Sequence, residues 1–519
     1  MIKNLLLRWP YFYPLIFALT YSQSPIFTAN QNTKFISGLA RAGYGDISSD
    51  WMAAITDPFP VFSTLLKWQY EWLGLHFGVH ILFFIIVALY AALSLGIARH
   101  LFGIRETGPA AMGVFSFLWL LIHMEGFRAD FLAWFPEGLG EQYLLGPYYQ
   151  PCVFGVLILG GLLAYMQGRY LLAAICFILG PIFHPAYLIS SAILLLVLSL
   201  FSGRGSTAPR FKRLMGCLLL VLISLGVYGF WSFNALTSGD PSIRAEAHRL
   251  LAETRISHHA LPVEWDLYQT VAFFLISGLA GWVARGTLIG RLLLATLALT
   301  GFSVIWAAVS FNPTVAVAAP WRVSVFLAPL SWIVLAAYVA AWLRPKFLVF
   351  SQSWTHLLAG VAVLISIWAG AAGVHDFIEG YQRKTREDYY AVTQFMKRYH
   401  TPGNQYLIPP EEANIRLEAG VPVFANAKSH PSKDSEYLDW HQRILAAKSV
   451  YKGPEDQVWS QLVSLKNRGL ITHVVWPQSK GDFPMQEKAT RVYEDKDYSL
   501  WDMRTPSAGN KVREQTSQT

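Results

Sequence analysis

Charged residues are scarce in this chain. Asp, Glu, Lys and Arg make up 14% of its 519 residues, whereas 54% of the residues are hydrophobic. This composition is too apolar for a soluble multidomain enzyme and is typical of a membrane protein. The Lys and Arg residues give a formal net charge of +8 but occur in short loops between apolar runs. Because they are not gathered on one folded face, we expect no nucleic-acid partner.

Cysteine is also rare. Cys152, Cys176 and Cys217 fall in or beside hydrophobic segments, and the long C-terminal part has none. This distribution excludes a disulfide framework and a thiolate metal site. The C-terminal part also lacks a Gly-rich phosphate loop and a metal-ligand spacing. We therefore expect it to pack on the membrane part or to help bind an acceptor rather than to carry out chemistry itself.

Long apolar runs, in contrast, are abundant. A helix that crosses lipid needs ~20 mostly apolar residues, because its backbone groups must be satisfied internally. The stretch 170–201 is divided in its middle by Pro181 and Pro185, which break a helix. The sequence predicts about eleven membrane helices, at 9–29, 76–98, 109–123, 151–167, 170–183, 186–201, 214–233, 268–284, 290–310, 321–343 and 355–373.

The loops between these helices differ in charge. Lys and Arg gather in alternate loops, and most Asp and Glu residues lie in the others. The excess of Lys and Arg marks cytoplasmic loops, so the N-terminus is predicted to be cytoplasmic. An odd number of spans then leaves the chain from about residue 375 outside the cytoplasm, together with the acidic loops.

The composition changes after the last apolar run. Apolar patches of strand length occur at 406–408, 421–424, 472–476 and 498–503, and helical patterns occur near 386–399, 434–449 and 455–468. This alternation predicts a small α/β domain. The predicted organisation is a transmembrane domain over 1–374, an outer α/β domain over 375–505 and a disordered tail over 506–519.

The first outer loop, residues 30–75, has no obvious secondary structure, and a loop of this length is usually functional. It carries Asp46, Asp50 and Asp57 among aromatic residues and glycines. Such acids suit contact with a sugar and the role of a carboxylate base. Each acid alone also has a structural explanation, since Asp46 and Asp50 can cap helices and Asp57 can begin a turn with Pro58.

Other outer segments hold further candidates. Tyr149 and Gln150 precede the fourth crossing, and the break at Pro185 places His184 on the same predicted side. We consider these three residues candidate substrate ligands. A single histidine before a proline is also compatible with a structural role.

The later outer loops add basic groups. His258 and His259 are adjacent, so they point in different directions and rarely bind one metal together, although either can bind phosphate. Arg322 opens the tenth predicted helix, where an unpaired guanidinium is costly unless it meets a phosphate or a carboxylate. It can instead extend to the membrane interface.

The predicted topology places these acids and basic groups on one side of the membrane: Asp50, Asp57, His184, His258, His259 and Arg322. Transfer of a sugar from a lipid phosphate needs a base for the acceptor and cationic groups for the leaving phosphate. The set of residues therefore fits that chemistry.

The arrangement resembles the GT-C superfamily of integral membrane glycosyltransferases. Its features are a first helix, a long outer loop with an acid soon after it, many further spans and a C-terminal outer domain. The strings that resemble bacterial GT-C-like proteins are Asn30-Gln31-Asn32, Gly43-Tyr44-Gly45, Ser49-Asp50-Trp51, Asp57-Pro58, His184-Pro185, residues 255–262, residues 415–423, Lys428-Ser429-His430-Pro431 and Asp439-Trp440.

The resemblance implies a polyprenyl-phosphate sugar donor, a glycan, lipid or protein acceptor and a location in the bacterial inner membrane, with the C-terminal domain in the periplasm. It also implies that a first-loop aspartate is the catalytic base, matched here to Asp50, with Asp46 as the nearest rival. Arg322 and one of the two histidines would then bind the departing phosphate, with inversion at the anomeric carbon. Some members of the superfamily hold a divalent cation, such as Mg²⁺ or Mn²⁺, with a pair of acids. The first loop of this chain has no Asp-x-Asp pair, so the need for such a cofactor stays open.

Other functions fit the same residues. A transporter or flippase of a lipid-linked or anionic substrate would use the same cavity, but it usually shows paired internal repeats, which this sequence lacks. An O-antigen-type polymerase or ligase and a non-catalytic partner in polysaccharide assembly are further alternatives.

Overall fold

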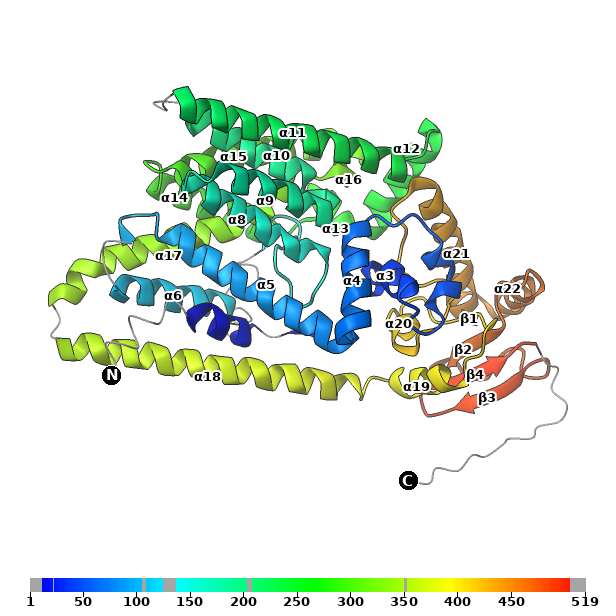
Figure 1. Ribbon diagram of the computed structural model, residues 1–519. Coiled ribbons are helices and arrows are strands. Elements are labelled where there is room, and N and C mark those ends of the chain that lie inside the picture. Colours follow the sequence, from blue (N-terminus) through cyan, green and yellow to red (C-terminus); the bar gives the residue numbers. More distant parts are fainter. Residues whose placement is uncertain are drawn as a thin grey trace. The chain divides into compact units, whose positions relative to one another are not determined.

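The computed structural model describes residues 12–21, 23–104, 109–124, 137–202, 208–349 and 352–504 (Figure 1). The chain divides into two compact units. The first, here called the membrane unit, comprises Met1–Gln23, His80–Asn234 and Asp240–Ile378. The second, here called the composite unit, comprises Ser24–Val79, Ala235–Gly239 and Glu379–Thr519. The composite unit therefore joins the first predicted outer loop to the C-terminal part.

Long helices coincide with the predicted spans. They are residues 12–20, α5 (Leu75–Ala98), α6 (Pro109–His123), α8 (Val156–Met166), α9 (Tyr170–Phe183), α10 (Leu188–Ser202), α11 (Ala208–Leu236), α14 (Leu267–Val283), α15 (Leu288–Val309), α17 (Ser324–Val349) and α18 (Gln352–Lys384). As predicted, the Pro181 to Pro185 region separates α9 from α10. The first predicted helix was too long at its C-terminal end, because the helix ends at residue 20 and the chain turns over residues 26–30.

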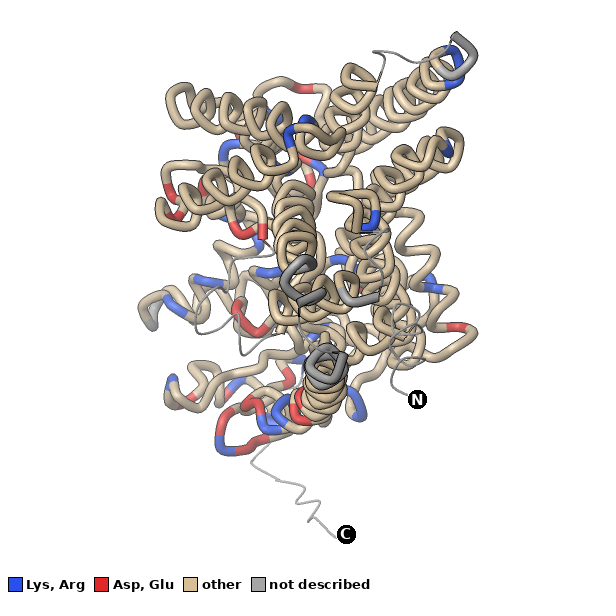
Figure 2. Tube along the Cα trace, turned by 90° about the vertical axis from the view of Figure 1, so that its left-hand side faces the viewer, with Lys and Arg blue, Asp and Glu red and all other residues tan. Residues whose placement is uncertain are grey.

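Several of these helices have the length and apolarity of membrane spans. Among the described residues, six are long and apolar enough to cross a membrane, and four shorter apolar helices accompany them. The prediction of a polytopic α-helical membrane protein is therefore confirmed. Figure 2 shows long stretches of helix without a charged residue, as lipid contact requires. The number of spans and the side on which each loop lies stay predictions.

Burial separates central from peripheral helices in the membrane unit. The apolar segment Pro313–Leu343, which includes most of α17, has 78% of its most apolar window buried, whereas the window in Phe211–Leu236 of α11 has 17% buried. α17 packs against α6 and α14, and α8 packs against α9. Because lipid is as apolar as a protein core, the exposed Leu and Phe side chains of α11 are expected at a lipid-facing surface.

Short elements join the long helices of the membrane unit. They are η5 (Pro151–Gly155), η6 (Pro185–Tyr187), α12 (Pro241–Leu250), the π-helical turn η7 (Leu251–Arg255), α13 (Ser257–Ala260), η8 (Pro262–Glu264), α16 (Pro313–Ala318) and η9 (Pro320–Val323). Ala252, Ala260 and Ala316 form a small shared core. This core brings the loop with the paired histidines next to the segment that leads to Arg322.

The first outer loop is not structureless, contrary to the prediction. It forms α2 (Gln31–Lys34), α3 (Ile36–Arg41), η1 (Ile47–Ser49), η2 (Trp51–Ala53) and α4 (Pro60–Leu73). α3 packs against α4, and the buried Phe35 and Phe62 rings lie 6.0 Å apart. Apart from α4, these elements have only three to six residues, too few to show a clear helical periodicity.

The predicted C-terminal α/β part is present. A four-stranded sheet has the order β1-β2-β4-β3, with strands β1 (Tyr406–Leu407), β2 (His473–Pro477), β3 (Thr490–Glu494) and β4 (Tyr498–Asp502). β1 is parallel to β2, and β4 is antiparallel to both β2 and β3. The helices are α19 (Tyr390–Tyr399), α20 (Ile415–Ala419), α21 (Asp434–Lys452) and α22 (Glu455–Asn467).

Two strands of this part differ from the sequence prediction. The predicted strand at 421–424 was wrong, because only Val423 makes a single parallel bridge, to Tyr406, and Pro422 has no N–H to continue a ladder. β3 was missed. The predicted tail, 506–519, and the start of the first predicted helix lie outside the described residues, and the boundary at 374/375 stays a prediction.

Candidate functional site

Asp46 lies at the edge of a cavity in the composite unit. Its Oδ2 atom is 3.0 Å from Nε2 of His400, and the Ser49 hydroxyl donates to its Oδ1 at 2.5 Å. The Asp46 side chain is 20% exposed. The cavity has a volume of about 380 Å³ and is lined by Tyr44, Gly45, Asp46, Lys397, His400, Pro402, Ala419 and Gly420. A sugar ring fits such a space.

Polar side chains line this cavity. Burial raises the pKa of Tyr44, so its hydroxyl stays protonated at the cavity wall and can donate a hydrogen bond. Lys397 contributes an exposed ammonium group. The cavity thus combines a carboxylate, a cation and a hydroxyl donor.

Two glycines bring the first outer segment against α20 at this cavity. The N–H of Asp46 donates to the Gly420 carbonyl at 2.7 Å. A Cβ atom on Gly45 would lie 2.3 Å from that carbonyl oxygen, so no larger residue fits without a shift of the backbone. Gly45 and Gly420 also have φ angles of +55° and +67°, which favour glycine. The backbone of Gly45 and Asp46 is therefore fixed by a close contact with Gly420.

Asp50, the first choice for the base, has a different environment. Its side chain and that of Arg416 are both 0% exposed, and Arg416 Nε lies 2.9 Å from Asp50 Oδ2. The carboxylate also accepts from the backbone N–H groups of Met52 and Val423, each at 2.8 Å. Because no acceptor can reach a carboxylate without exposed surface, this geometry assigns Asp50 to an internal ion pair and a helix cap, the structural alternative considered for it above.

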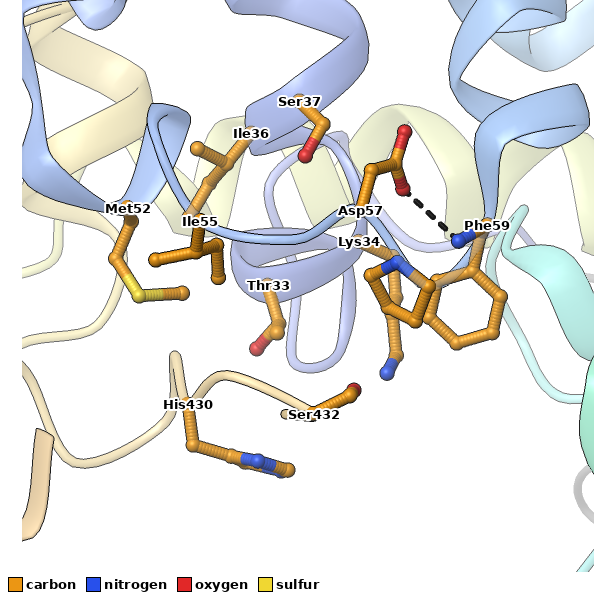
Figure 3. Close-up of a pocket in the computed structure, with 11 residues that line it drawn as sticks. Thr33, Lys34, Ile36, Ser37, Met52, Ile55, Asp57, Phe59, His430 and Ser432 are labelled. Carbon is orange, nitrogen blue, oxygen red and sulfur yellow. Dashed lines mark hydrogen bonds between the residues drawn. The ribbon is translucent and has the colours of Figure 1, made fainter. Parts of the chain in front are cut away.

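Asp57 lies beside a much smaller cavity. Figure 3 shows its carboxylate accepting from the Phe59 N–H, at 2.9 Å, with Lys34 and His430 nearby. Arg41 Nη2 is 2.6 Å from the other carboxylate oxygen. The cavity has a volume of about 20 Å³, enough for one water molecule but not for a sugar. Asp57 is thus held as the start of a turn.

In the membrane unit, Arg322 lies at the start of the central segment. Its Nε donates a hydrogen bond to Oε1 of the buried Gln142 at 3.0 Å. The neighbouring Trp321 indole donates to the His259 carbonyl at 3.0 Å. The loop around Gln142, the paired histidines and Arg322 therefore form one cluster, here called the Arg322 cluster.

The two histidines of this cluster differ in environment. His259 Nδ1 is 2.6 Å from the Gly140 carbonyl. Burial is the largest cause that lowers the pKa of His259 to about 4. His259 is therefore neutral near pH 7 and donates its Nδ1–H to Gly140, so it supplies no positive charge to a phosphate. His258, whose ring lies 3.9 Å from that of His259, faces a neighbouring cavity.

The cavity beside His258 is rich in carboxylates. It has a volume of about 290 Å³. Its lining includes Glu137, Glu141, His258, Glu264, Trp265 and Asp266. Asp266 also caps α14, since it accepts from the Gln269 N–H at 2.7 Å. A carbohydrate can be bound by such a mixture of an indole and carboxylates.

The remaining predicted ligands lie deeper. Tyr149 and Gln150 are 1% and 4% exposed, and Gln150 donates to the Tyr143 hydroxyl at 3.2 Å. His184 ends α9 and packs against the Tyr187 ring at 4.9 Å. These positions are those of internal packing residues, so the structure gives Tyr149 and Gln150 no surface for a substrate.

The structure therefore brings His258, His259 and Arg322 together in the membrane unit, while Asp46, Asp50 and Asp57 lie in the composite unit. Sequence reasoning missed Gln142, His400 and Arg416. No local signal identifies them, because each is defined by a partner far away in the chain: His400 and Asp46, for example, are 354 residues apart.

Among the residues that the structure describes, none of the predicted site residues belongs to a group of three His, Cys, Asp or Glu side chains close enough to hold one ion. A divalent cation stays a prediction.

Comparison with known proteins supports the fold. The structure is similar to that of ArnT from Cupriavidus metallidurans bound to undecaprenyl phosphate, with a TM-score of 0.51, 11% sequence identity and coverage of 98% of this chain and 99% of that chain. The apo structure of the same protein gives a TM-score of 0.44 and 11% identity over 94% of this chain and 95% of that one.

Sequence comparisons add less. A family model described as a domain of unknown function (DUF6798) matches residues 387–447, and no curated protein matches significantly. The chain therefore shares the fold of this ArnT structure over nearly its whole length, which confirms the fold expected from the sequence.

Proposed function

We propose that this chain is a glycosyltransferase of the bacterial inner membrane, which transfers a sugar from a polyprenyl-phosphate donor to a periplasmic or lipid-linked acceptor in envelope glycan assembly. Two observations support the proposal: a GT-C fold over nearly the whole chain, shared with a protein whose structure holds undecaprenyl phosphate, and a reachable carboxylate in a cavity of sugar size. The second observation carries it. Fold alone does not define a reaction.

Asp46 is the base in this proposal. The acceptor hydroxyl oxygen attacks the anomeric carbon, the bond from that carbon to the phosphate oxygen breaks, and the hydroxyl proton passes to the Asp46 carboxylate. Of the three aspartates in the first outer segment, Asp46 alone lines a cavity that a sugar can enter. A base must come within ~3 Å of the proton that it removes, so access decides between the acids.

Arg322 is the phosphate ligand in this proposal. The leaving group is a polyprenyl phosphate, and its negative charge grows as the bond to the sugar breaks. A guanidinium held by Gln142 at 3.0 Å presents its two terminal amino groups as a planar fork, which matches the oxygens of a phosphate. The proposal keeps the predicted topology, in which the Arg322 cluster and the composite unit face the periplasm.

Release of the lipid carrier tests the proposal. The purified chain in lipid nanodiscs is incubated with radiolabelled polyprenyl-phosphate sugars and a mixture of envelope glycolipids as acceptor. We expect free polyprenyl phosphate in an amount equal to the label found in the acceptor. Movement of intact labelled lipid across a proteoliposome bilayer, without release of phosphate, would instead establish a flippase.

A further inference from the structure

The segment that matches the family model of unknown function makes long-range contacts that fix Asp46 and Asp50 of the first outer segment. Residues 387–447 supply His400 to Asp46, and Arg416 and the Val423 N–H to Asp50. They also supply the Gly420 carbonyl to the Asp46 N–H. Each of these contacts joins positions more than 350 residues apart.

His400 lies where it can control the direction of the Asp46 carboxylate. It follows the last residue of α19, and its side chain is 10% exposed. Its Nε2 meets Oδ2 of Asp46, while Ser49 meets Oδ1. One carboxylate oxygen is therefore held by a residue of the same segment, Ser49, and the other by a residue of the C-terminal part, His400.

The backbone contact adds a second restraint. Gly45 meets Gly420 so closely that Gly45 has no room for a Cβ atom, and Asp46 is the next residue after Gly45. A shift of the Gly45 backbone therefore moves the Asp46 carboxylate directly. Displacement of a catalytic group by 1 Å can cost about a hundredfold in rate.

We propose that residues 387–447 act as a positioning element for the Asp46 carboxylate, with His400 as its positioning residue and the Gly45–Gly420 contact as its backbone support. This inference rests on the proposed function, in which Asp46 is the base. It gives the matched segment a role within the transferase: it does not touch the reacting atoms but holds the group that removes the acceptor proton.

Substitution of His400 tests the side-chain restraint. In His400→Ala we expect kcat to fall about thirtyfold while KM for the donor stays within twofold, because the donor is bound elsewhere. In His400→Gln the amide Nε2 can still donate to Asp46, so at least a third of the wild-type kcat should return. His375→Ala, which removes a histidine with a 76% exposed side chain, is the control and should leave kcat unchanged.

A pair of glycine variants tests the backbone restraint. Gly43 and Gly45 both have positive φ angles, +69° and +55°, so alanine strains both. Only Gly45 meets another backbone, since nothing lies within 4 Å of a Cβ on Gly43. We expect the kcat of Gly45→Ala to be at least tenfold lower than that of Gly43→Ala.

The outcomes separate this inference from the proposed function. Full turnover in His400→Ala, or equal kcat in the two glycine variants, would overturn the positioning role even if Asp46→Asn is inactive. Full turnover in Asp46→Asn would overturn the proposed base and the positioning role with it. A loss in His400→Ala that His400→Gln does not restore, with a matching loss of thermal stability, would mean that His400 only supports the fold.

Discussion

Asp46 and Asp50 lie four residues apart in the same outer segment, but their surroundings differ. The Asp46 side chain is 20% exposed and faces a cavity of about 380 Å³. The Asp50 side chain is 0% exposed and is paired with the equally buried Arg416. The same residue type therefore serves two purposes here, and access and partners distinguish them where sequence position does not.

The largest effect is expected at Asp46. Asp46→Asn keeps the size and most hydrogen-bonding capacity of the side chain but removes the base, so turnover should fall about a thousandfold. The thermal unfolding temperature should change little, because the side chain is partly exposed. Radiolabel transfer and differential scanning fluorimetry measure the two quantities. Asp439→Asn, at a side chain that is 56% exposed, is the control.

Asp50 should respond in the opposite way. Asp50→Asn leaves the Arg416 charge buried without its partner, at a cost of about 3–5 kcal/mol in the free energy of unfolding. We expect a lower unfolding temperature and less folded protein in the membrane, whereas turnover per folded molecule should stay near that of the wild type. A stable but inactive Asp50→Asn protein would indicate that Asp50, and not Asp46, is the base.

Arg322 should show a smaller, specific effect. Arg322→Lys keeps a positive charge but loses the planar fork, so we expect KM for the lipid donor to rise about tenfold, with a larger rise in Arg322→Gln. Titration of donor concentration at saturating acceptor measures it. If both variants keep the wild-type KM, Arg322 is held by Gln142 for structural reasons alone.

The smallest effect concerns pH and lies away from both acids. Burial is the largest cause that lowers the pKa of His473, in β2, to about 4. Between this value and ~6.5 the unfolded chain binds the proton and the folded chain does not, so stability is complete above pH ~6.5 and falls as the pH approaches 4. At pH 5 the loss should be about 2 kcal/mol.

Thermal unfolding of wild type and His473→Gln at pH 7.5 and 5.0 checks this expectation. The variant cannot be protonated, so its stability should depend less on pH. His259 contributes a dependence of the same sign in the membrane unit, and it is retained in the variant. Identical pH dependence in the two proteins would show that His473 takes up its proton in the folded state.

The long helices could be predicted from the sequence because an apolar run of sufficient length has few alternatives in lipid. The Pro181 to Pro185 break was also predictable, since proline acts through local backbone chemistry. The elements α2, α3, η1 and η2 of the first outer segment were not predictable, because each has at most six residues and the segment makes contacts with distant parts of the chain. β3 was missed for a related reason: its residues 490–494 are only partly buried and show no clear alternation.

The candidate site, like the fold, could be predicted only in part. The relevant segments, Asp46 to Asp57 and the loop with His258 and His259, were recognisable from their residue types. Which acid is reachable was not, because it depends on Arg416, His400 and Gly420, which meet the first outer segment only in the folded chain. Sequence reasoning therefore found the segment and preferred Asp50 as the base, whereas in the structure Asp46 is the more accessible carboxylate.

The central claim is that Asp46 activates an acceptor hydroxyl for a single displacement at the anomeric carbon. The anomeric configuration of the product, determined by NMR from its ¹H coupling constant and compared with that of the donor, tests it most directly. The account predicts inversion, with the hydroxyl attacking opposite the departing phosphate. Retention of configuration would require a covalent sugar intermediate and would contradict the assignment of Asp46 as a base.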